Sequence, residues 1–301
     1  MYGIIETPEK KHIHFFRIFY VLFSILIIVF LLYVLFMYVY NNSKVTNTTP
    51  QTMHFAENFS LTSCKNTFNI KKNELLQIKK GDLLTEEQYN KIINIYSNQT
   101  KKTVFLTFDD GPSKNVTPLI LDLLKQENIK ATFFVLGSNV ERYPEILQRE
   151  YYEGHFIASH GYSHRYSEIY QSVDTILNDY KLCENAVRLA LNMPNFSCRV
   201  YRFPGGSVGG KYHDIKHNSK ELLKQEHIAY LDWNALTRDA EGTPTRESII
   251  ESLESTVNDK DVVVLLMHDS SSKILTYDTL PNVINFFKEK GYTFKCLYDV
   301  L

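Results

Sequence analysis

The sequence predicts an α/β fold in which a parallel sheet is covered by helices and is preceded by a single transmembrane helix. From Lys102 to the C-terminus, short apolar runs rich in β-branched and aromatic residues alternate with amphipathic stretches. This alternation is typical of parallel sheets, either doubly wound or closed as a barrel. Polar side chains follow the apolar runs directly, at the strand ends where such folds gather functional groups. The third observation is an uncharged apolar run at residues 18–40, which is long enough to span a bilayer.

The overall composition excludes some classes of partner. Charged residues make up 22% of the 301 residues and the formal net charge is −1, so no global field favours nucleic acid. None of the four cysteines lies in a C-x-x-C pair, so neither a zinc ribbon nor a thioredoxin-type site is indicated. Cys183 and Cys198 are compatible with a disulfide or with two free buried thiols, and the sequence leaves both open.

The N-terminal part is predicted to anchor the chain in a membrane. Residues 18–40 are too long for the apolar region of a secretory signal peptide, and no small-residue cleavage site follows. Three basic residues, Lys10, Lys11 and Arg17, precede the run, and only Lys44 follows it closely. The positive-inside rule therefore makes residues 1–17 a cytoplasmic tail. The rest of this single-pass cell-membrane protein is expected outside the cytoplasm.

Residues 41–101 are predicted to be an extracytoplasmic linker or stalk. Their first part is rich in Asn, Ser and Thr and contains Pro50, as linkers often do. A capping-box pattern that begins at Thr85 predicts a short helix near the end of this segment. The folded catalytic domain is expected to occupy residues 102–301.

The strands and helices of this domain are predicted from the change of hydrophobic period along the chain. Strands are expected at residues 103–108, 131–136, 155–159, 199–202, 228–232, 262–267 and 292–296. Helices are expected near residues 115–126, 142–150, 171–190, 218–225, 246–257 and 279–289.

Adjacent carboxylates follow the first predicted strand. Asp109 and Asp110 come directly after Phe108 and are followed by Gly111. On its own this is an ordinary turn sequence. Two neighbouring carboxylates disfavour double ionisation, however, unless a cation or hydrogen bonds hold them.

Two histidines follow the third predicted strand. His160 and His164 are four residues apart, so their imidazoles lie on one side of a helical turn or tight loop and can bind one ion. Alone, such a pair is commonly two surface histidines. Together with Asp110 they form a set of two histidines and one carboxylate, which is usual for catalytic zinc with an open position. Asp109 would then remain free beside the ion.

Three later strand ends also carry polar residues. Arg202 ends the strand at 199–202 and is suited to hold a catalytic carboxylate by a charge-assisted pair. Asp232 and Trp233 follow the next strand, where the tryptophan indicates either a sugar-binding wall or core packing. His268 follows the strand at 262–267, and the Asp269 after it predicts a general acid with a nearby carboxylate to tune it.

These residues together resemble the polysaccharide deacetylases of the nodulation-protein-B type, carbohydrate esterase family 4. The resemblance covers about Lys102 to Leu301 and meets the five family motifs in order. They are Thr107-Phe108-Asp109-Asp110-Gly111, His160 with His164, Arg202-Phe203-Pro204-Gly205-Gly206, Asp232-Trp233, and Leu266-Met267-His268. The fold implied by the resemblance is a distorted (β/α) barrel with seven or eight strands.

The resemblance also implies a role for each motif residue. Asp109 is the catalytic base, and the metal ligands are Asp110, His160 and His164. Arg202 orients Asp109, and Asp232 supports Arg202. Trp233 lines the groove, Leu266 lies against the acetyl methyl group, and His268 is the general acid. The Gly205 amide is expected to help hold the oxyanion.

Two positions depart from the family pattern. The family often has Ser or Thr directly after the first metal histidine, where this chain has Gly161. Because that hydroxyl usually braces the loop, its loss is expected to loosen the metal site without removing a ligand. An aromatic residue often follows the proline of the third motif, where this chain has Gly205. That change is expected to alter groove shape and substrate preference rather than catalysis.

The function implied is metal-dependent removal of N-acetyl groups from a polysaccharide, with release of acetate. Peptidoglycan N-acetylglucosamine is the expected substrate, because a domain tethered outside a membrane meets the cell wall first. Exopolysaccharide, chitin-like polymer and acetylated xylan are the alternatives, and an inactive glycan-binding protein is the alternative of another class. The ion is expected to be one zinc, and the same ligands also suit cobalt or nickel. A monomer without a nucleic-acid partner is expected.

Overall fold

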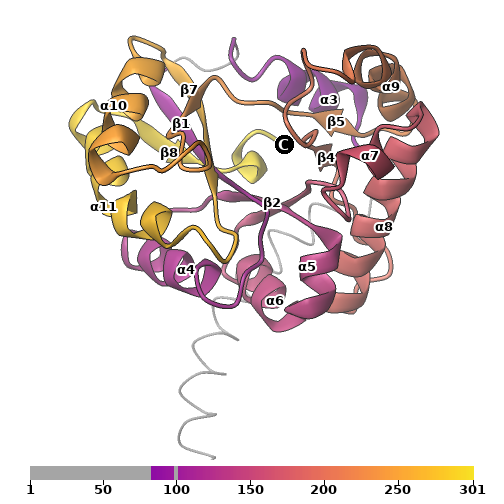
Figure 1. Cartoon of the computed structure of the whole chain (residues 1–301), viewed down its shortest axis with the longest axis horizontal. Coiled ribbons are helices and arrows are strands. Elements are labelled where there is room, and N and C mark those ends of the chain that lie inside the picture. Colours follow the sequence, from indigo (N-terminus) through magenta and orange to yellow (C-terminus); the bar gives the residue numbers. More distant parts are fainter. Residues whose placement is uncertain (1–82, 98–100) are drawn as a thin grey trace, which may run out of the picture. The chain divides into compact units, whose positions relative to one another are not determined.

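The computed structural model describes residues 83–97 and 101–301 (Figure 1). The predicted tail, the predicted transmembrane segment 18–40 and most of the predicted linker lie outside these residues. Among the residues that are described, no helix has the length and apolar character needed to cross a bilayer.

The elements alternate along the chain as expected for a parallel α/β fold. The strands are β1 (Thr103–Asp109), β2 (Thr132–Val135), β3 (Phe156–Ser159), β4 (Val200–Tyr201), β5 (Ala229–Tyr230), β6 (Ala235–Leu236), β7 (Val262–His268) and β8 (Thr293–Lys295). The helices are α3 (Glu86–Ile93), α4 (Thr117–Gln126), α5 (Gly137–Arg142), α6 (Pro144–Tyr152), α7 (Tyr166–Ile169), α8 (Val173–Leu191), α9 (His213–Gln225), α10 (Arg246–Val257) and α11 (Ile274–Glu289). A 3₁₀ turn, η1 (Leu297–Asp299), lies near the C-terminus.

The strands form one parallel sheet in the order β5-β4-β3-β2-β1-β7-β6, with β8 paired to the first half of β1. All the strand pairs in the described part of the chain are parallel. The ends of this path, β5 and β6, are not paired to each other. The prediction of a parallel α/β fold with seven or eight strands is therefore confirmed, but the sheet is a curled half-barrel rather than a closed barrel.

Alternation along the strands divides the core into an outer and an inner layer. The outer-facing residues, such as Leu106, Phe133 and Leu265, pack under the helices. Figure 1 shows these helices, α4 to α11, ranged around the outside of the sheet. The inner-facing residues, such as Phe105 and Phe134, belong to a second buried cluster.

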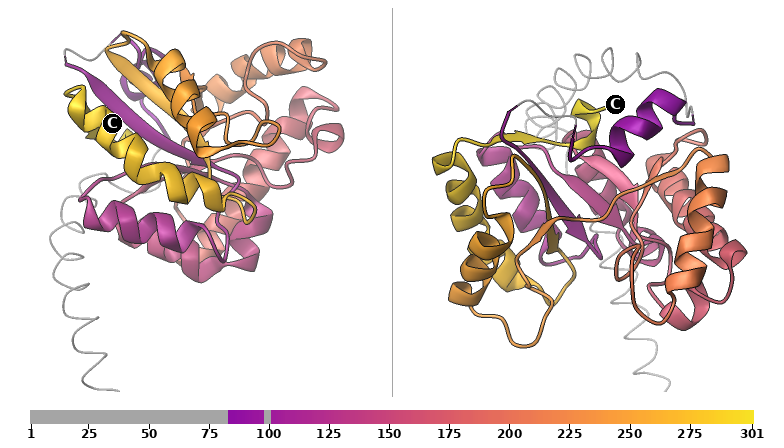
Figure 2. Two further views of the ribbon diagram at one scale, coloured as in Figure 1. Left: turned by 60° about the vertical axis from the view of Figure 1, so that its left-hand side comes forward. Right: turned by 90° about the horizontal axis from the view of Figure 1, so that it is seen from above.

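Helix α3 and the residues beside it pack against this inner layer. Leu84, Ile92 and Ile95 are buried in the inner cluster together with Leu297 of η1. The helix lies beside the end of the chain (Figure 2), where the Gln88 side-chain amide donates to the Leu301 carbonyl. The predicted capping box is present, with reciprocal hydrogen bonds between Thr85 and Gln88. Leu84, Ile92 and Ile95 thus contribute to the core although they lie in the predicted linker segment, and the domain boundary at residue 102 stays a prediction.

Helices α9 and α11 each begin five residues before their predicted starts, and the remaining differences concern short segments. Strand β6 and helices α5 and α7 were not predicted, because two to six residues are too few to show a period. The described cysteines, Cys183, Cys198 and Cys296, are buried free thiols.

Candidate active site

The inner-layer alternation continues past the strand ends into a cluster of polar side chains. Along β1, the buried Phe105 is followed on the same face by Thr107 and Asp109. By the same period of two, Ala158 leads to His160, Val200 to Arg202 and Val264 to His268. In each of these strands, the inward-facing positions lead to a polar residue at the C-terminal end. The four polar side chains therefore meet at the C-terminal edge of the sheet, on its inner face.

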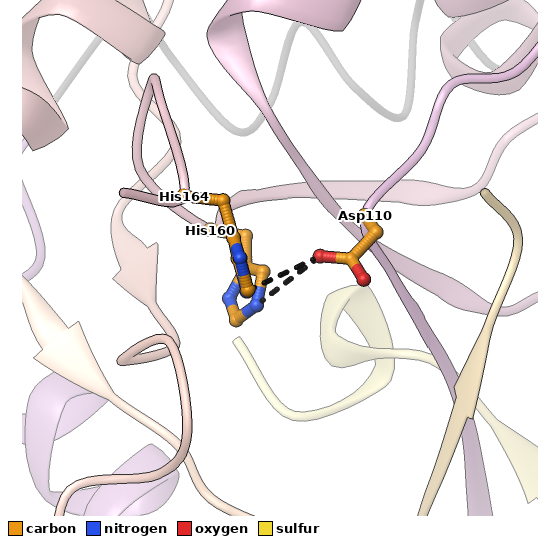
Figure 3. A group of neighbouring side chains, drawn as sticks. All are labelled: Asp110, His160 and His164. Atoms are coloured by element: carbon orange, nitrogen blue, oxygen red, sulfur yellow. Dashed lines mark ion pairs between the residues drawn. The ribbon is translucent and has the colours of Figure 1, made fainter. Parts of the chain in front are cut away.

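Asp110 breaks the alternation and turns back to the same place. Its φ of 73° lies in the left-handed region, which ends the strand and redirects the side chain. As Figure 3 shows, its carboxylate faces His160 and His164, which come from the loop after β3. Asp110 Oδ1 lies 3.7 Å from His160 Nε2 and 3.5 Å from His164 Nε2.

These three side chains fit a divalent metal ion. Their ligand atoms all lie within 4.8 Å of one another. Ligands at about 2.0–2.1 Å from a tetrahedral zinc lie about 3.3 Å apart, close to the distances found here. Asp110 Oδ1 is buried and has no hydrogen-bond partner among the described residues. A cation between the three groups would satisfy this atom, so the predicted ligand set is compatible with the geometry.

His160 is held in the form that a metal ligand needs. Its Nδ1 lies 2.8 Å from the Arg202 carbonyl oxygen. Because a carbonyl only accepts, Nδ1 carries the proton and the lone pair of Nε2 faces Asp110. Burial lowers the pKa of His160 to about 3, so the imidazole is neutral at physiological pH.

Asp109 is buried beside the ligand set and is paired with Arg202. Arg202 Nη1 donates to Asp109 Oδ1 at 2.8 Å, and the other carboxylate oxygen lies 3.7 Å from His160 Nε2. Burial raises the pKa of Asp109, and the opposing effects of Arg202 and His268 do not cancel this rise. The predicted pair with Arg202 is present. It limits the effect of burial on this pKa without cancelling it, so Asp109 is a stronger base than an exposed aspartate.

Arg202 is fixed by more groups than the sequence indicated. Its side chain is fully buried, and its guanidinium lies 3.8 Å from the centre of the Phe134 ring. Nε donates to the Leu231 carbonyl at 2.9 Å, and Nη1 also donates to Thr107 Oγ1 at 2.7 Å. Thr107 can accept this bond because its own hydroxyl donates to the Leu265 carbonyl.

The predicted support of Arg202 by the Asp232 carboxylate is not found. Only the main-chain carbonyl of Asp232 accepts from Arg202, at 3.2 Å. The carboxylate accepts from the Ser207 amide at 2.9 Å and from its hydroxyl at 2.6 Å. The Asp232 carboxylate therefore holds the turn after Gly206 in place, and only the main chain of Asp232 contacts the guanidinium.

His268 is paired with Asp239, which was not predicted. His268 Nδ1 lies 2.9 Å from Asp239 Oδ1, and the His268 amide donates to Asp239 Oδ2 at 2.8 Å. Burial alone would lower the pKa of His268, but the hydrogen bond and charge of Asp239, with Asp109 nearby, raise it to about 9. The carboxylate expected in this role, Asp269, is fully buried and accepts instead from the Thr117 hydroxyl at 2.6 Å.

Asp239 could have been found only with knowledge of β6. The register pairs Leu236 of β6 with Leu266 of β7, so the chain just after β6 runs beside His268. The strand has two residues, which are too few to give a periodic signal in the sequence.

Two aromatic side chains approach the paired glycines of the third motif. A Cβ atom on Gly205 would lie 2.6 Å from the Tyr166 hydroxyl, and one on Gly206 would lie 3.3 Å from the Trp233 ring. The Tyr166 ring centre is 5.5 Å from that of His164. Tyr166 therefore takes up space that a side chain at position 205 would need, beside the predicted metal ligand His164. It was not predicted.

The remaining predicted substrate-binding groups lie at the same edge of the sheet. Leu266 is buried on β7, two residues before His268 on the same face. Gly205 is exposed, and its amide donates no hydrogen bond within residues 83–97 and 101–301. This free N–H is available to an anionic ligand at the mouth of the site.

Comparisons with known proteins agree with this geometry. The family model described as polysaccharide deacetylase matches residues 96–222. A peptidoglycan-N-acetylglucosamine deacetylase of Bacillus cereus is 30% identical over 209 residues, which cover 68% of this chain and 72% of that protein. The peptidoglycan-N-acetylglucosamine deacetylase PgdA of Listeria monocytogenes is 31% identical over 204 residues, 68% of this chain and 40% of that protein.

Solved structures show the same fold. A Streptococcus mutans CE4 esterase is 33% identical with a TM-score of 0.63, and the match covers 73% of this chain and 97% of that one. The catalytic domain of a peptidoglycan N-acetylglucosamine deacetylase from Eubacterium rectale is 31% identical with a TM-score of 0.60. This second match covers 66% of this chain and 90% of that domain.

Proposed function

The chain belongs to the polysaccharide deacetylase family, and we propose that it is a metal-dependent hydrolase that removes N-acetyl groups from N-acetylglucosamine of peptidoglycan. The observation that carries the proposal is that His160 and His164 face the buried Asp110 Oδ1, which has no hydrogen-bond partner among the described residues. A buried, arginine-held carboxylate and a carboxylate-held histidine flank this trio. Such a site combines metal ligands, a base and an acid within one end of the sheet.

The three ligands would hold one divalent cation, with zinc as the first choice and cobalt or nickel as alternatives. When bound, this ion supplies Lewis acidity toward the acetamide carbonyl and the attacking water. The protein contributes the preorganisation. His160 is oriented by the Arg202 carbonyl, and Asp110 by its left-handed backbone.

The proton transfers are assigned to Asp109 and His268. Asp109 accepts the proton of the attacking water through the carboxylate oxygen that Arg202 does not occupy. The free Gly205 amide donates to the oxygen on which negative charge develops. His268 carries its proton on Nε2, since Nδ1 is engaged by Asp239, and donates it to the departing amine.

Asp239→Asn is expected to shift the basic limb of the pH–rate profile downward. A general acid works only while protonated, so activity is present below the pKa of His268 and is lost above it. In the wild type this limb is expected near pH 9. The substitution weakens the hydrogen bond to Nδ1 and removes the negative charge, the two largest effects that raise this pKa. The limb should therefore move toward 6.5, the ordinary value of histidine. The measurement is kcat against pH at saturating metal. An unchanged limb would show that His268 is not the acid.

Tyr166 is proposed to form part of the sugar-binding surface. Its ring is 38% exposed and packs against Tyr170 and Tyr212, with centroid distances of 5.6 Å and 6.4 Å. No hydrogen bond engages its hydroxyl within the described residues. An exposed ring face backed by other rings, next to a metal ligand, is suited to pack on a sugar ring.

Tyr166→Ala is expected to raise KM about tenfold, equivalent to ~1.4 kcal/mol, with kcat nearly unchanged. Tyr166→Phe keeps the ring and is expected to lose less. Tyr152→Ala, which removes an exposed tyrosine of α6, is the control and should leave both constants unchanged. A fall in kcat with constant KM would instead place Tyr166 in the chemical step.

The substrate is tested most simply by acetate release. The purified full chain is incubated with intact peptidoglycan, with N-acetylglucosamine oligomers and with acetylated xylan. Greater release from peptidoglycan is expected, and preferential release from one of the others would replace that substrate assignment. No release from any of them at saturating metal would favour an inactive glycan-binding protein.

Residues 18–40 are proposed to anchor the protein in the cell membrane, with the catalytic domain outside the cytoplasm and active as a monomer. The anchor and its orientation rest on the apolar length of this segment and on the basic residues that precede it. The protein should stay with the membrane fraction during alkaline washing without detergent. Its release from the membranes under these conditions would contradict the anchor.

A further inference from the structure

The metal-binding histidines lie on a loop whose backbone is held by one carboxylate. Between His160 and His164, the Tyr162 amide donates to Asp179 Oδ2 at 2.8 Å and the Ser163 amide donates to Asp179 Oδ1 at 3.3 Å. The Gly161 amide donates to the hydroxyl of Ser159, the last residue of β3. Asp179 is thus a side chain from outside the loop that binds two of its successive amides.

This loop needs a fixed anchor because of its backbone conformation. His164 has a φ of 56° and Gly161 has a φ of 83°, both in the left-handed region. A non-glycine residue held there costs of the order of 1–3 kcal/mol and persists only when its surroundings fix it. The two bonds to Asp179 fix the residues that lie between these positions.

Asp179 is rigidly placed by helix α8. It lies on the buried side of the helix beside Ile176, Tyr180 and Cys183 and is 8% exposed. Helix α8 itself begins with a capping box at Ser172 and packs against α5. The helix therefore holds the carboxylate in a fixed position as a hydrogen-bond acceptor. An aspartate on the apolar side of a helix is unfavourable unless its carboxylate has such partners.

Gly161 leaves the space that Asp179 occupies. A Cβ atom at position 161 would lie 2.1 Å from Asp179 Oδ2, closer than any real contact. The glycine and the carboxylate are consequently a matched pair: a side chain at 161 would have to displace the group that holds the loop.

We propose that Asp179 is a positioning residue of the metal site, which sets the separation of His160 and His164 by binding the amides of Tyr162 and Ser163. The inference rests on the proposed function, in that the two histidines are metal ligands. It explains how this chain keeps an ordered ligand loop without a hydroxyl at position 161. Groups that orient metal ligands typically contribute 10–100-fold to metal affinity.

The test is the zinc affinity of the full chain, measured by competition with a chromophoric chelator. Asp179→Ala removes both acceptors and is expected to weaken zinc binding about 10–100-fold. Asp179→Asn keeps one acceptor, retains the side-chain shape and should also bind zinc at least several-fold more weakly. Asp174→Ala removes an exposed carboxylate from the same helix and is the matched control, with unchanged affinity.

The thermal unfolding of the metal-free proteins separates positioning from general stability. A purely structural role of Asp179 would lower the unfolding temperature and leave the zinc affinity of the folded protein at the wild-type value, which would overturn the proposal. If the alanine variant does not fold, Asp179→Asn decides by the same comparison. At saturating zinc, the folded variants are expected to regain most of the wild-type kcat.

A double-mutant cycle with Gly161→Ser tests the matched pair. Because the serine collides with Asp179, the losses of zinc affinity in Gly161→Ser and Asp179→Ala should be less than additive in the double variant. Strictly additive losses would show that the two positions act separately. If the wild type itself binds no zinc, the proposed function fails first, whereas normal wild-type binding with an unaffected Asp179→Ala overturns only the role of Asp179.

Discussion

Asp109→Asn is expected to bind metal as the wild type does and to lose nearly all deacetylase activity. Asparagine has the shape of aspartate, and its oxygen can still accept from Arg202, so the three ligands nearby should keep their places. It cannot accept the proton of water, however. General base catalysis contributes about 10²–10⁴-fold, and a loss of that size in kcat is expected.

Zinc content by elemental analysis and acetate release measure the two halves of this prediction. Asp122→Asn is the control, because Asp122 is an exposed aspartate of α4 that pairs with Arg149. Its activity should match the wild type. A metal-loaded Asp109→Asn protein that retained a large fraction of wild-type turnover would show that another group is the base.

Arg202→Lys is expected to lower kcat about 100-fold although the charge is conserved. The guanidinium donates to four separate groups: the Asp109 carboxylate, the Thr107 hydroxyl and the carbonyls of Leu231 and Asp232. A lysine ammonium cannot reproduce this planar arrangement, so Asp109 should shift. A displacement of about 1 Å from the productive geometry can cost 10²-fold in rate.

Arg202→Met should additionally destabilise the fold. Removal of one partner of a buried ion pair typically costs about 3–5 kcal/mol, because the other charge is left unpaired. The free energy of unfolding in urea would measure this cost. Arg246→Lys changes an exposed arginine of α10 that donates to the Asp278 carbonyl and should alter neither activity nor stability measurably. Wild-type activity in Arg202→Lys would contradict the role given to the guanidinium.

The sequence contained enough information for the long elements and for the residues that end them. Strands β1 and β7 are apolar over their length, and their last inward-facing residues, Asp109 and His268, interrupt that pattern with charge. Because parallel strands end at one edge of a sheet, such interruptions predict a common site. His160 and Arg202 were identified in the same way.

The partners of these residues could not be predicted, because they depend on tertiary contacts of short or irregular segments. Asp239 follows a strand of two residues, and its proximity to His268 depends on the register of β6 against β7. Asp232 was paired with Arg202 on the basis of the motif, but hydrogen-bond donors of the nearby Ser207 take its carboxylate. The sheet is open because β5 and β6 do not pair, and neither strand is long enough to signal this in the sequence.

Position 161 illustrates how a departure from a family pattern can be misjudged. The glycine was expected to loosen the metal-binding loop, since it lacks a bracing hydroxyl. In the structure, Asp179 occupies the space beside Gly161 and binds the two following amides. The sequence does contain a sign of Asp179, because an acidic residue stands among the apolar positions of the α8 segment. Only the fold shows which groups its carboxylate binds.

The central claim is that Asp110, His160 and His164 bind one ion on which deacetylation depends. The most direct test strips the full chain of metal, returns zinc in steps and follows acetate release from peptidoglycan. We expect no release from the stripped protein, a rate that rises linearly up to one ion per chain and a plateau thereafter. His160→Ala should stay inactive across the same range. Full acetate release by the stripped protein, or by His160→Ala at equal zinc, would contradict the claim.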